Sequence, residues 1–186
     1  MKAQFFATIL VSMSFLGAAT AQSRTEPAGA PAIRLMRAAL VEFAKKPELF
    51  RSIFERHWDM PSTNKEWRVE ADYHISSANR MLDEVKQARS NPAHGYDTEV
   101  KTTFTDGEFG VDVVQRSATS FESKSAICKK TASNGVKSTY TCKVSYSSAS
   151  ADEDGSESLF VYSLEFDVIP KAKKIVPRSI EHLAAG

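Results

Sequence analysis

Residues 100–113 read Val-Lys-Thr-Thr-Phe-Thr-Asp-Gly-Glu-Phe-Gly-Val-Asp-Val, and this stretch decides the fold of the chain. Apolar and polar residues alternate on both sides of Asp106 and Gly107, which is typical of two half-buried strands joined by a tight turn. An Asp-Gly loop, in which both residues take a positive φ, predicts that the apolar residues of the two strands share one face. The expected cross-strand pairs are Phe104 with Phe109, Thr102 with Val111, and Val100 with Val113.

A second hairpin is expected around residues 134–135, and it brings the two cysteines of the chain together. A regular two-residue loop places Cys128 opposite Thr141, which leaves the cysteines on opposite faces of the sheet. A direct cross-strand disulfide requires Cys128 to lie opposite Cys142. The sequence therefore predicts a disulfide together with a bulge, or a loop of odd length, within residues 129–137.

Two further strands complete the predicted sheet. Residues 159–169 alternate between a side of large apolar residues and a side that carries Ser163, Glu165 and Asp167. This pattern is typical of a sheet with one face packed on the core and the other face exposed to solvent. A shorter strand over Lys174–Ile180 is expected at a sheet edge, because it contains a proline that cannot donate a main-chain hydrogen bond.

The region before the strands has the period of helices. Apolar residues recur at steps of three and four from Ile33, and residues 47–58 predict a short helix that is apolar enough to be largely buried. Thr63 and Glu66 form a predicted capping box at the start of a long helix over residues 63–90. Helices followed by an antiparallel meander predict an α+β fold, in which about three N-terminal helices pack on one face of the sheet.

The first 21 residues are typical of an export signal. One lysine precedes an apolar run that ends in small residues, and the run is shorter than the ~20 residues that cross a bilayer. We therefore expect a signal peptide over 1–21, a flexible leader over 22–31 and a single α+β domain over 32–186. The expected location is extracellular, or the periplasm if the source is a Gram-negative bacterium, with no membrane anchor.

Charge and motifs exclude several classes of function. Loss of Lys2 with the signal peptide lowers the 24 basic residues to 23, which equals the 23 acidic residues, so nucleic acid is not an expected partner. The four histidines lack metal-ligand spacing, and no phosphate loop or nucleophile elbow is present, so no metal, cofactor or catalytic residue is expected. Residues 152–157 are acidic but do not fit a calcium-binding frame, and we expect a solvated hairpin tip there.

A row of lysines and threonines marks the candidate binding surface. Small polar and basic side chains in rows on an exposed sheet face can bind an acidic protein partner or a glycan, although a soluble exposed face has the same composition. The candidate residues are Lys129, Lys137, Thr139, Thr141 and Lys143.

The sequence as a whole favours a small secreted binding protein without catalytic activity. Such a protein acts on another macromolecule outside the cytoplasm, as effectors, enzyme inhibitors and immunity proteins do. One alternative is a ribonuclease-like hydrolase, for which the chain offers suitable acid, base and phosphate-binding side chains. The other is a small-ligand carrier, if helices and sheet enclose a pocket. The side chains of the hydrolase alternative are His74, Arg116, Glu122 and His182.

Overall fold

The computed structural model of the protein describes residues 30–61, 63–90, 96–134 and 137–186. The predicted signal peptide and most of the predicted leader lie outside these residues, and the last two leader residues are instead helical. The elements in chain order are α1 (Ala30–Lys45), η1 (Pro47–Phe50), α2 (Arg51–His57), α3 (Glu66–Ser90), β1 (Asp97–Phe104), β2 (Glu108–Arg116), β3 (Ser120–Asn134), β4 (Lys137–Ala151), β5 (Glu157–Ile169), η2 (Pro170–Ala172) and β6 (Lys174–Ala185).

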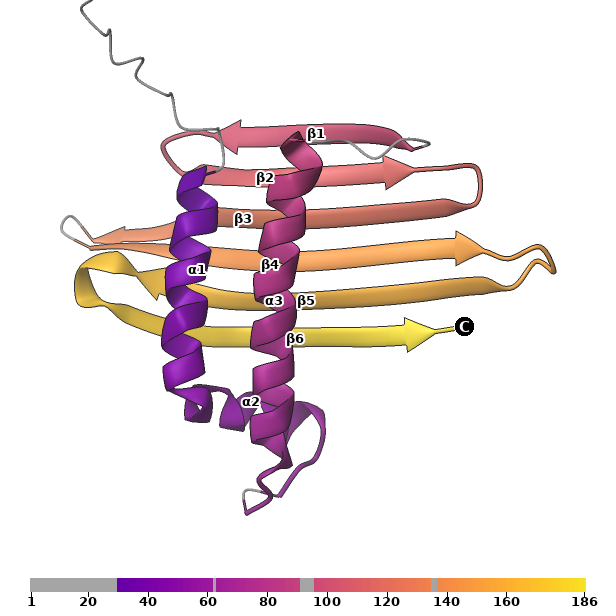
Figure 1. The fold of residues 1–186 in the computed structure, drawn as a ribbon. Coiled ribbons are helices and arrows are strands. Elements are labelled where there is room, and N and C mark those ends of the chain that lie inside the picture. The colour runs from indigo at the N-terminus through magenta and orange to yellow at the C-terminus, as the bar shows by residue number, and fades with distance from the viewer. Residues whose placement is uncertain (1–29, 62, 91–95, 135–136) are drawn as a thin grey trace, which may run out of the picture.

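The predicted α+β architecture is confirmed. Six antiparallel strands form one sheet in the order β1-β2-β3-β4-β5-β6, so every strand pairs with its neighbours in sequence. The helices α1, α2 and α3 pack on one face of this sheet, and α1 and α3 cross its strands (Figure 1). We call the face that the helices cover the inner face and the opposite one the outer face.

The helix boundaries follow local chemistry. Pro47 occupies the first turn of η1, where its missing N–H breaks no hydrogen bond. The long helix α3 begins at Glu66 and, at 1.5 Å per residue, is about 37 Å long. The predicted capping role of Thr63 is wrong: the N–H of Glu66 is donated to Asn64 Oδ1 (2.9 Å), and the Asn64 amide donates to the Glu66 carboxylate (3.0 Å).

The first hairpin has the predicted register, with Phe104 opposite Phe109. The predicted turn geometry is wrong, because neither Asp106 nor Gly107 has a positive φ. The side chain of Thr105 explains the difference, since its hydroxyl oxygen accepts the N–H of Glu108 at 3.0 Å. A side-chain acceptor thereby replaces the main-chain carbonyl that an Asp-Gly turn ordinarily uses.

The second hairpin contains the predicted bulge. Thr131 is the extra residue, since Lys130 pairs with Tyr140 and Ala132 with Thr139. The bulge places Cys128 opposite Cys142, and the two form a disulfide with a Cα–Cα distance of 4.0 Å. Both cysteines are buried in the core on the inner face.

The edge strand β6 is longer than predicted and runs to Ala185. It has its own bulge at Arg178, because Ser179 pairs with Glu165 while Pro177 pairs with Phe166. This bulge accommodates Pro177 at the sheet edge.

The core fills the space between the helices and the inner face. In the short helical segment Phe50, Ile53 and Phe54 are buried as expected, but Leu49 and Trp58 are each 36% exposed. Trp58 nevertheless stacks on the buried Phe54, with ring centroids 4.6 Å apart. The largest buried members of the core include Met36, Phe43, Leu82, Tyr162, Leu164 and Phe166.

Candidate functional site

The outer face of the sheet is the surface on which the sequence placed the candidate binding residues. Because side chains alternate between the two faces along a strand, the inward-facing Cys128 and Cys142 place Lys129, Thr141 and Lys143 on the outer face. The helices α1, α2 and α3 pack on the inner face, so none of these three described helices covers this surface. Thr139 shares the outer side of β4 with these residues, whereas the side chain of Lys137 is not described.

A hollow of about 310 Å³ lies on this surface, across the strands β3, β4, β5 and β6. It contains three of the predicted residues, so the register brings part of the candidate site together. Its lining residues are Ser125, Ile127, Lys129, Thr131, Thr141, Lys143, Glu165 and Arg178.

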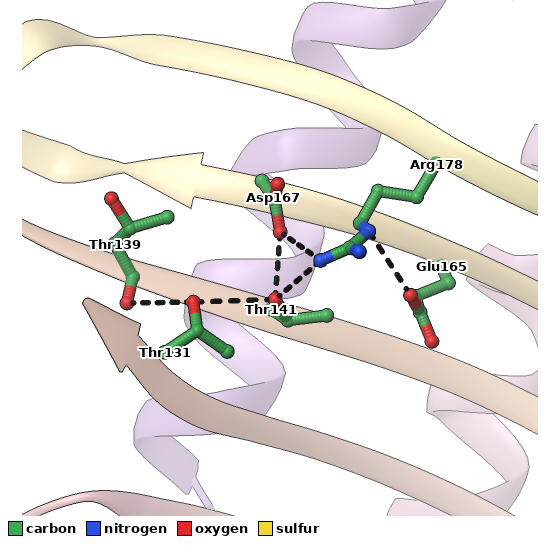
Figure 2. Close-up of polar contacts among 6 residues, drawn as sticks. All are labelled: Thr131, Thr139, Thr141, Glu165, Asp167 and Arg178. Atoms are coloured by element: carbon green, nitrogen blue, oxygen red, sulfur yellow. Dashed lines mark hydrogen bonds and ion pairs between the residues drawn. The ribbon is translucent and has the colours of Figure 1, made fainter.

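An arginine that the sequence analysis missed organises one side of the hollow. Figure 2 shows the Arg178 guanidinium between two carboxylates. Its Nε atom is 3.3 Å from Glu165 Oε1, and its Nη1 atom is 3.3 Å from Asp167 Oδ1. The same nitrogen donates to the Thr141 hydroxyl oxygen at 3.2 Å, and that hydroxyl donates to Asp167 at 2.7 Å. These contacts hold Thr141 and Asp167 in fixed orientations.

Both bulges of the sheet supply residues to this network. Arg178 is the extra residue of β6, and Thr131 is the extra residue of β3. The Thr131 hydroxyl lies 3.4 Å from both the Thr139 carbonyl oxygen and the Thr141 hydroxyl (Figure 2). Bulges commonly redirect side chains near binding sites, and here they gather polar groups from β3, β4, β5 and β6.

The charges in the hollow are unequally paired. Lys129 is 2.9 Å from Glu108, whose hydrogen bond and negative charge raise the pKa of the lysine. Lys143 lies between Ile127 and Glu165 on the neighbouring strands, is exposed, and takes part in none of the ion pairs formed by the described residues. Since Glu165 is engaged by Arg178, Lys143 is the side chain in the hollow that can bind an outside carboxylate.

The residues of the hydrolase alternative do not form one accessible site. The rings of His74 and His182 have centroids 5.9 Å apart, but His74 is fully buried, and burial together with the nearby His182 lowers its pKa to about 4. Arg116 lies 3.5 Å from Glu99 on the neighbouring strand, and Glu122 is 3.1 Å from a lysine. A phosphate therefore meets no convergent set of these four side chains.

The acidic hairpin tip is a self-contained turn. Gly155 has a φ of 84°, and the Ser156 N–H donates to Asp154 Oδ1 at 3.0 Å, which lowers the pKa of that carboxyl group. The Ser156 hydroxyl donates to Asp152 at 3.2 Å. Within the described ranges, no group of three or more histidine, cysteine, aspartate or glutamate side chains is placed to hold a metal ion.

Comparisons with known proteins do not assign the chain to a class. No protein-family model matches it, and the curated proteins and the solved structures gave no match either. In the part of the chain that the structure describes, each helix is too short or too polar to cross a bilayer. The disulfide between Cys128 and Cys142 is compatible with an extracellular protein.

Proposed function

We propose that the protein is a small secreted binding protein without catalytic activity, which docks on another macromolecule outside the cytoplasm through its outer sheet face. Effectors, enzyme inhibitors and immunity proteins act in this way. The observation that carries the proposal is the hollow around Lys143, where the neighbouring charges are already paired and this exposed lysine has no ion-pair partner among the described residues.

The arrangement favours a protein partner that presents a carboxylate. Arg178 and Lys129 are held by their own carboxylates, so they shape the hollow without attracting an anion strongly. The exposed Lys143 can pair with an aspartate or glutamate of the partner, while the surrounding hydroxyl groups donate and accept hydrogen bonds. The burial of His74 counts against the hydrolase alternative.

The experiment is a pull-down. Oxidised chain 22–186 is the bait, and the proteins that it would meet outside the cytoplasm are the candidate partners. Two further baits carry Lys143→Glu, alone and with Lys137→Glu, and a matched control carries Lys65→Glu, an exposed lysine in the segment before α3. We expect one stoichiometric partner, identified by mass spectrometry, to bind the wild type and the control equally. Its affinity for the Lys143→Glu variant, measured by calorimetry with the purified partner, should fall by about tenfold or more.

Three outcomes contradict the proposal. These are a partner that binds the Lys143→Glu variant as tightly as the wild type, a footprint that lies on the helices, and the absence of any stoichiometric partner. Turnover of RNA by the wild-type chain that a His182→Ala substitution abolishes would support the hydrolase alternative instead.

A further inference from the structure

The inner face of the sheet carries a second site that is independent of the proposed docking surface. The strands continue past α3, so the helices leave one end of the inner face uncovered (Figure 1). A cleft of about 310 Å³ lies there between α3 and the strands β3, β4 and β5. This volume is at the lower end of the range of small-molecule sites.

The sheet side of the cleft carries aromatic rings. Tyr146 on β4 and Phe160 on β5 have ring centroids 5.6 Å apart and an interplanar angle of 54°. The ring of His182 on β6 lies 5.5 Å from Phe160 and continues the row. Both Tyr146 and Phe160 line the cleft and are partly exposed, so a ligand can contact them.

A compact ion-pair network lies beside the rings. Lys124 has a side chain that is only 14% exposed, and its ammonium group lies 3.1 Å from Glu122 and 3.8 Å from Glu84. Arg80 is 3.9 Å from the same Glu84. Two cations therefore face two carboxylates, and the charged lining of the cleft carries no net charge.

The equal numbers of positive and negative side chains in the cleft favour a ligand without charge. An anionic ligand has to compete with Glu84 and Glu122 for Lys124, and a cationic ligand has to replace Lys124 between the two carboxylates. A wholly apolar ligand would cover the ion pairs without giving them hydrogen bonds, which costs free energy. A neutral ligand rich in hydroxyl groups meets none of these penalties, because hydroxyl groups both donate and accept hydrogen bonds.

We propose that the cleft binds a neutral sugar, as a pyranose unit that stacks on Phe160 and packs against the tilted ring of Tyr146. A pyranose has an apolar face of C–H groups that suits the negative face of an aromatic ring, and hydroxyl groups at its edge. In the cleft the hydroxyl groups reach the carboxylates of Glu84 and Glu122 and the hydroxyl of Ser77, which also lines the cleft. The unit can be a free oligosaccharide or the end of a longer glycan.

The test measures binding of purified trisaccharides to oxidised chain 22–186 by calorimetry and by NMR. The neutral probes are trimers of glucose, mannose, galactose and N-acetylglucosamine, and the charged comparators are trimers of galacturonic acid and glucosamine. We expect at least one neutral trimer to bind at millimolar concentration or tighter, and both charged comparators to bind about tenfold more weakly or not at all. A polysaccharide built from the same sugar then distinguishes a terminal glycan unit from a free oligosaccharide.

Two variants locate the binding. Phe160→Ala should weaken binding of the neutral trimer about tenfold. Phe160→Leu, which keeps most of the apolar volume, should also weaken binding and serves if the alanine variant does not fold. The matched control is Phe104→Ala, since Phe104 is 68% exposed at the opposite edge of the sheet and should not affect binding.

The Lys143→Glu variant separates this proposal from the proposed docking function, because it should retain full sugar binding. The sugar site is overturned if no neutral trimer binds at millimolar concentration. It is also overturned if a charged trimer binds as well as a neutral one, or if folded Phe160 variants bind unchanged.

Discussion

Tyr162 on β5 donates its hydroxyl hydrogen to the main-chain carbonyl oxygen of His74 on α3, 88 residues earlier in the chain. The two rings also stack, with centroids 5.2 Å apart and an interplanar angle of 18°. Both residues are buried, and burial raises the pKa of the tyrosine. This pair joins the long helix to the sheet next to the sugar cleft, which Tyr162 also lines.

Substitution Tyr162→Phe should lower the free energy of unfolding by about 1–2 kcal/mol. The variant removes one hydrogen bond and leaves a buried carbonyl oxygen with one partner fewer. Urea denaturation monitored by circular dichroism measures the change. Tyr96→Phe, at an exposed tyrosine, is the matched control and should change stability by less than about 0.5 kcal/mol. Equal effects of the two substitutions would show that the bond to His74 is not stabilising.

The protein should lose stability as the pH falls from about 6.5 towards 4. The pKa of His74 is about 4 in the folded chain and 6.5 for the free side chain. In this interval the unfolded chain takes up a proton that the folded chain does not, so protonation favours unfolding. The difference corresponds to a loss of at most about 3 kcal/mol at the acid end. Neither ring nitrogen of His74 has a hydrogen-bond partner among the described residues, which agrees with a neutral ring.

The variant His74→Phe tests this pH dependence. It should flatten the dependence between pH 6.5 and 4, because the buried group no longer titrates. Denaturation curves collected at half-unit pH intervals give the slopes. His57→Phe serves as the control because it replaces a different histidine, one on α2, and should leave the wild-type slope in place. An unchanged slope in the His74 variant would assign the acid sensitivity to other groups.

Removal of the disulfide should destabilise the chain by about 3 kcal/mol. The cysteines are 14 residues apart, and in the chain-entropy model a closed loop of about 15 residues contributes this amount. Urea denaturation of the wild type with and without reductant measures the loss, and the double variant Cys128→Ala/Cys142→Ala should be insensitive to reductant. Coincident curves for the oxidised and reduced wild type would contradict the expectation.

Substitution Gly110→Ala should destabilise the sheet by about 2 kcal/mol. A Cβ atom at this position would lie 2.8 Å from the Ala126 carbonyl oxygen and 2.8 Å from Ile127 Cγ1, so β2 and β3 have to move apart. The matched control is Gly107→Ala, where the nearest atom is 4.0 Å away and φ is not positive. That substitution should be neutral or slightly stabilising, because alanine restricts the unfolded chain. Thermal unfolding of both variants distinguishes the two cases.

The register of the sheet was predictable because it depends on whether the number of residues between two paired positions is odd or even. The alternation on each side of Gly107 fixes the first hairpin, and the requirement that Cys128 face Cys142 demands one extra residue, which the structure places at Thr131. These are constraints between residues close in sequence. The prediction of a positive φ at Gly107 was wrong, because the hydroxyl oxygen of the nearby Thr105 accepts the N–H of Glu108 in this turn.

The contents of the two sites depend on contacts between distant residues. Thr141 and Lys143 could be placed on one face from alternation alone, and Lys129 joins them once Cys128 has to lie opposite Cys142. Arg178, in contrast, reaches the hollow through a bulge that the pairing of β6 with β5 determines. The cleft depends on where α3 crosses the strands. Local sequence patterns contain no signal for that crossing, so Lys124 could not be predicted to lie beside α3.

The meander order also has a consequence for the kinetics of folding. Each strand pairs with a neighbour in sequence, so the hairpins close short loops and lose little chain entropy when they form. Contacts such as that between Tyr162 and His74 close a loop of almost 90 residues and are expected to form later. A sheet that forms before its helices dock leaves its apolar inner face in water for a time. The rate of helix docking, rather than the stability of the native state, then determines how long the folding chain is open to aggregation.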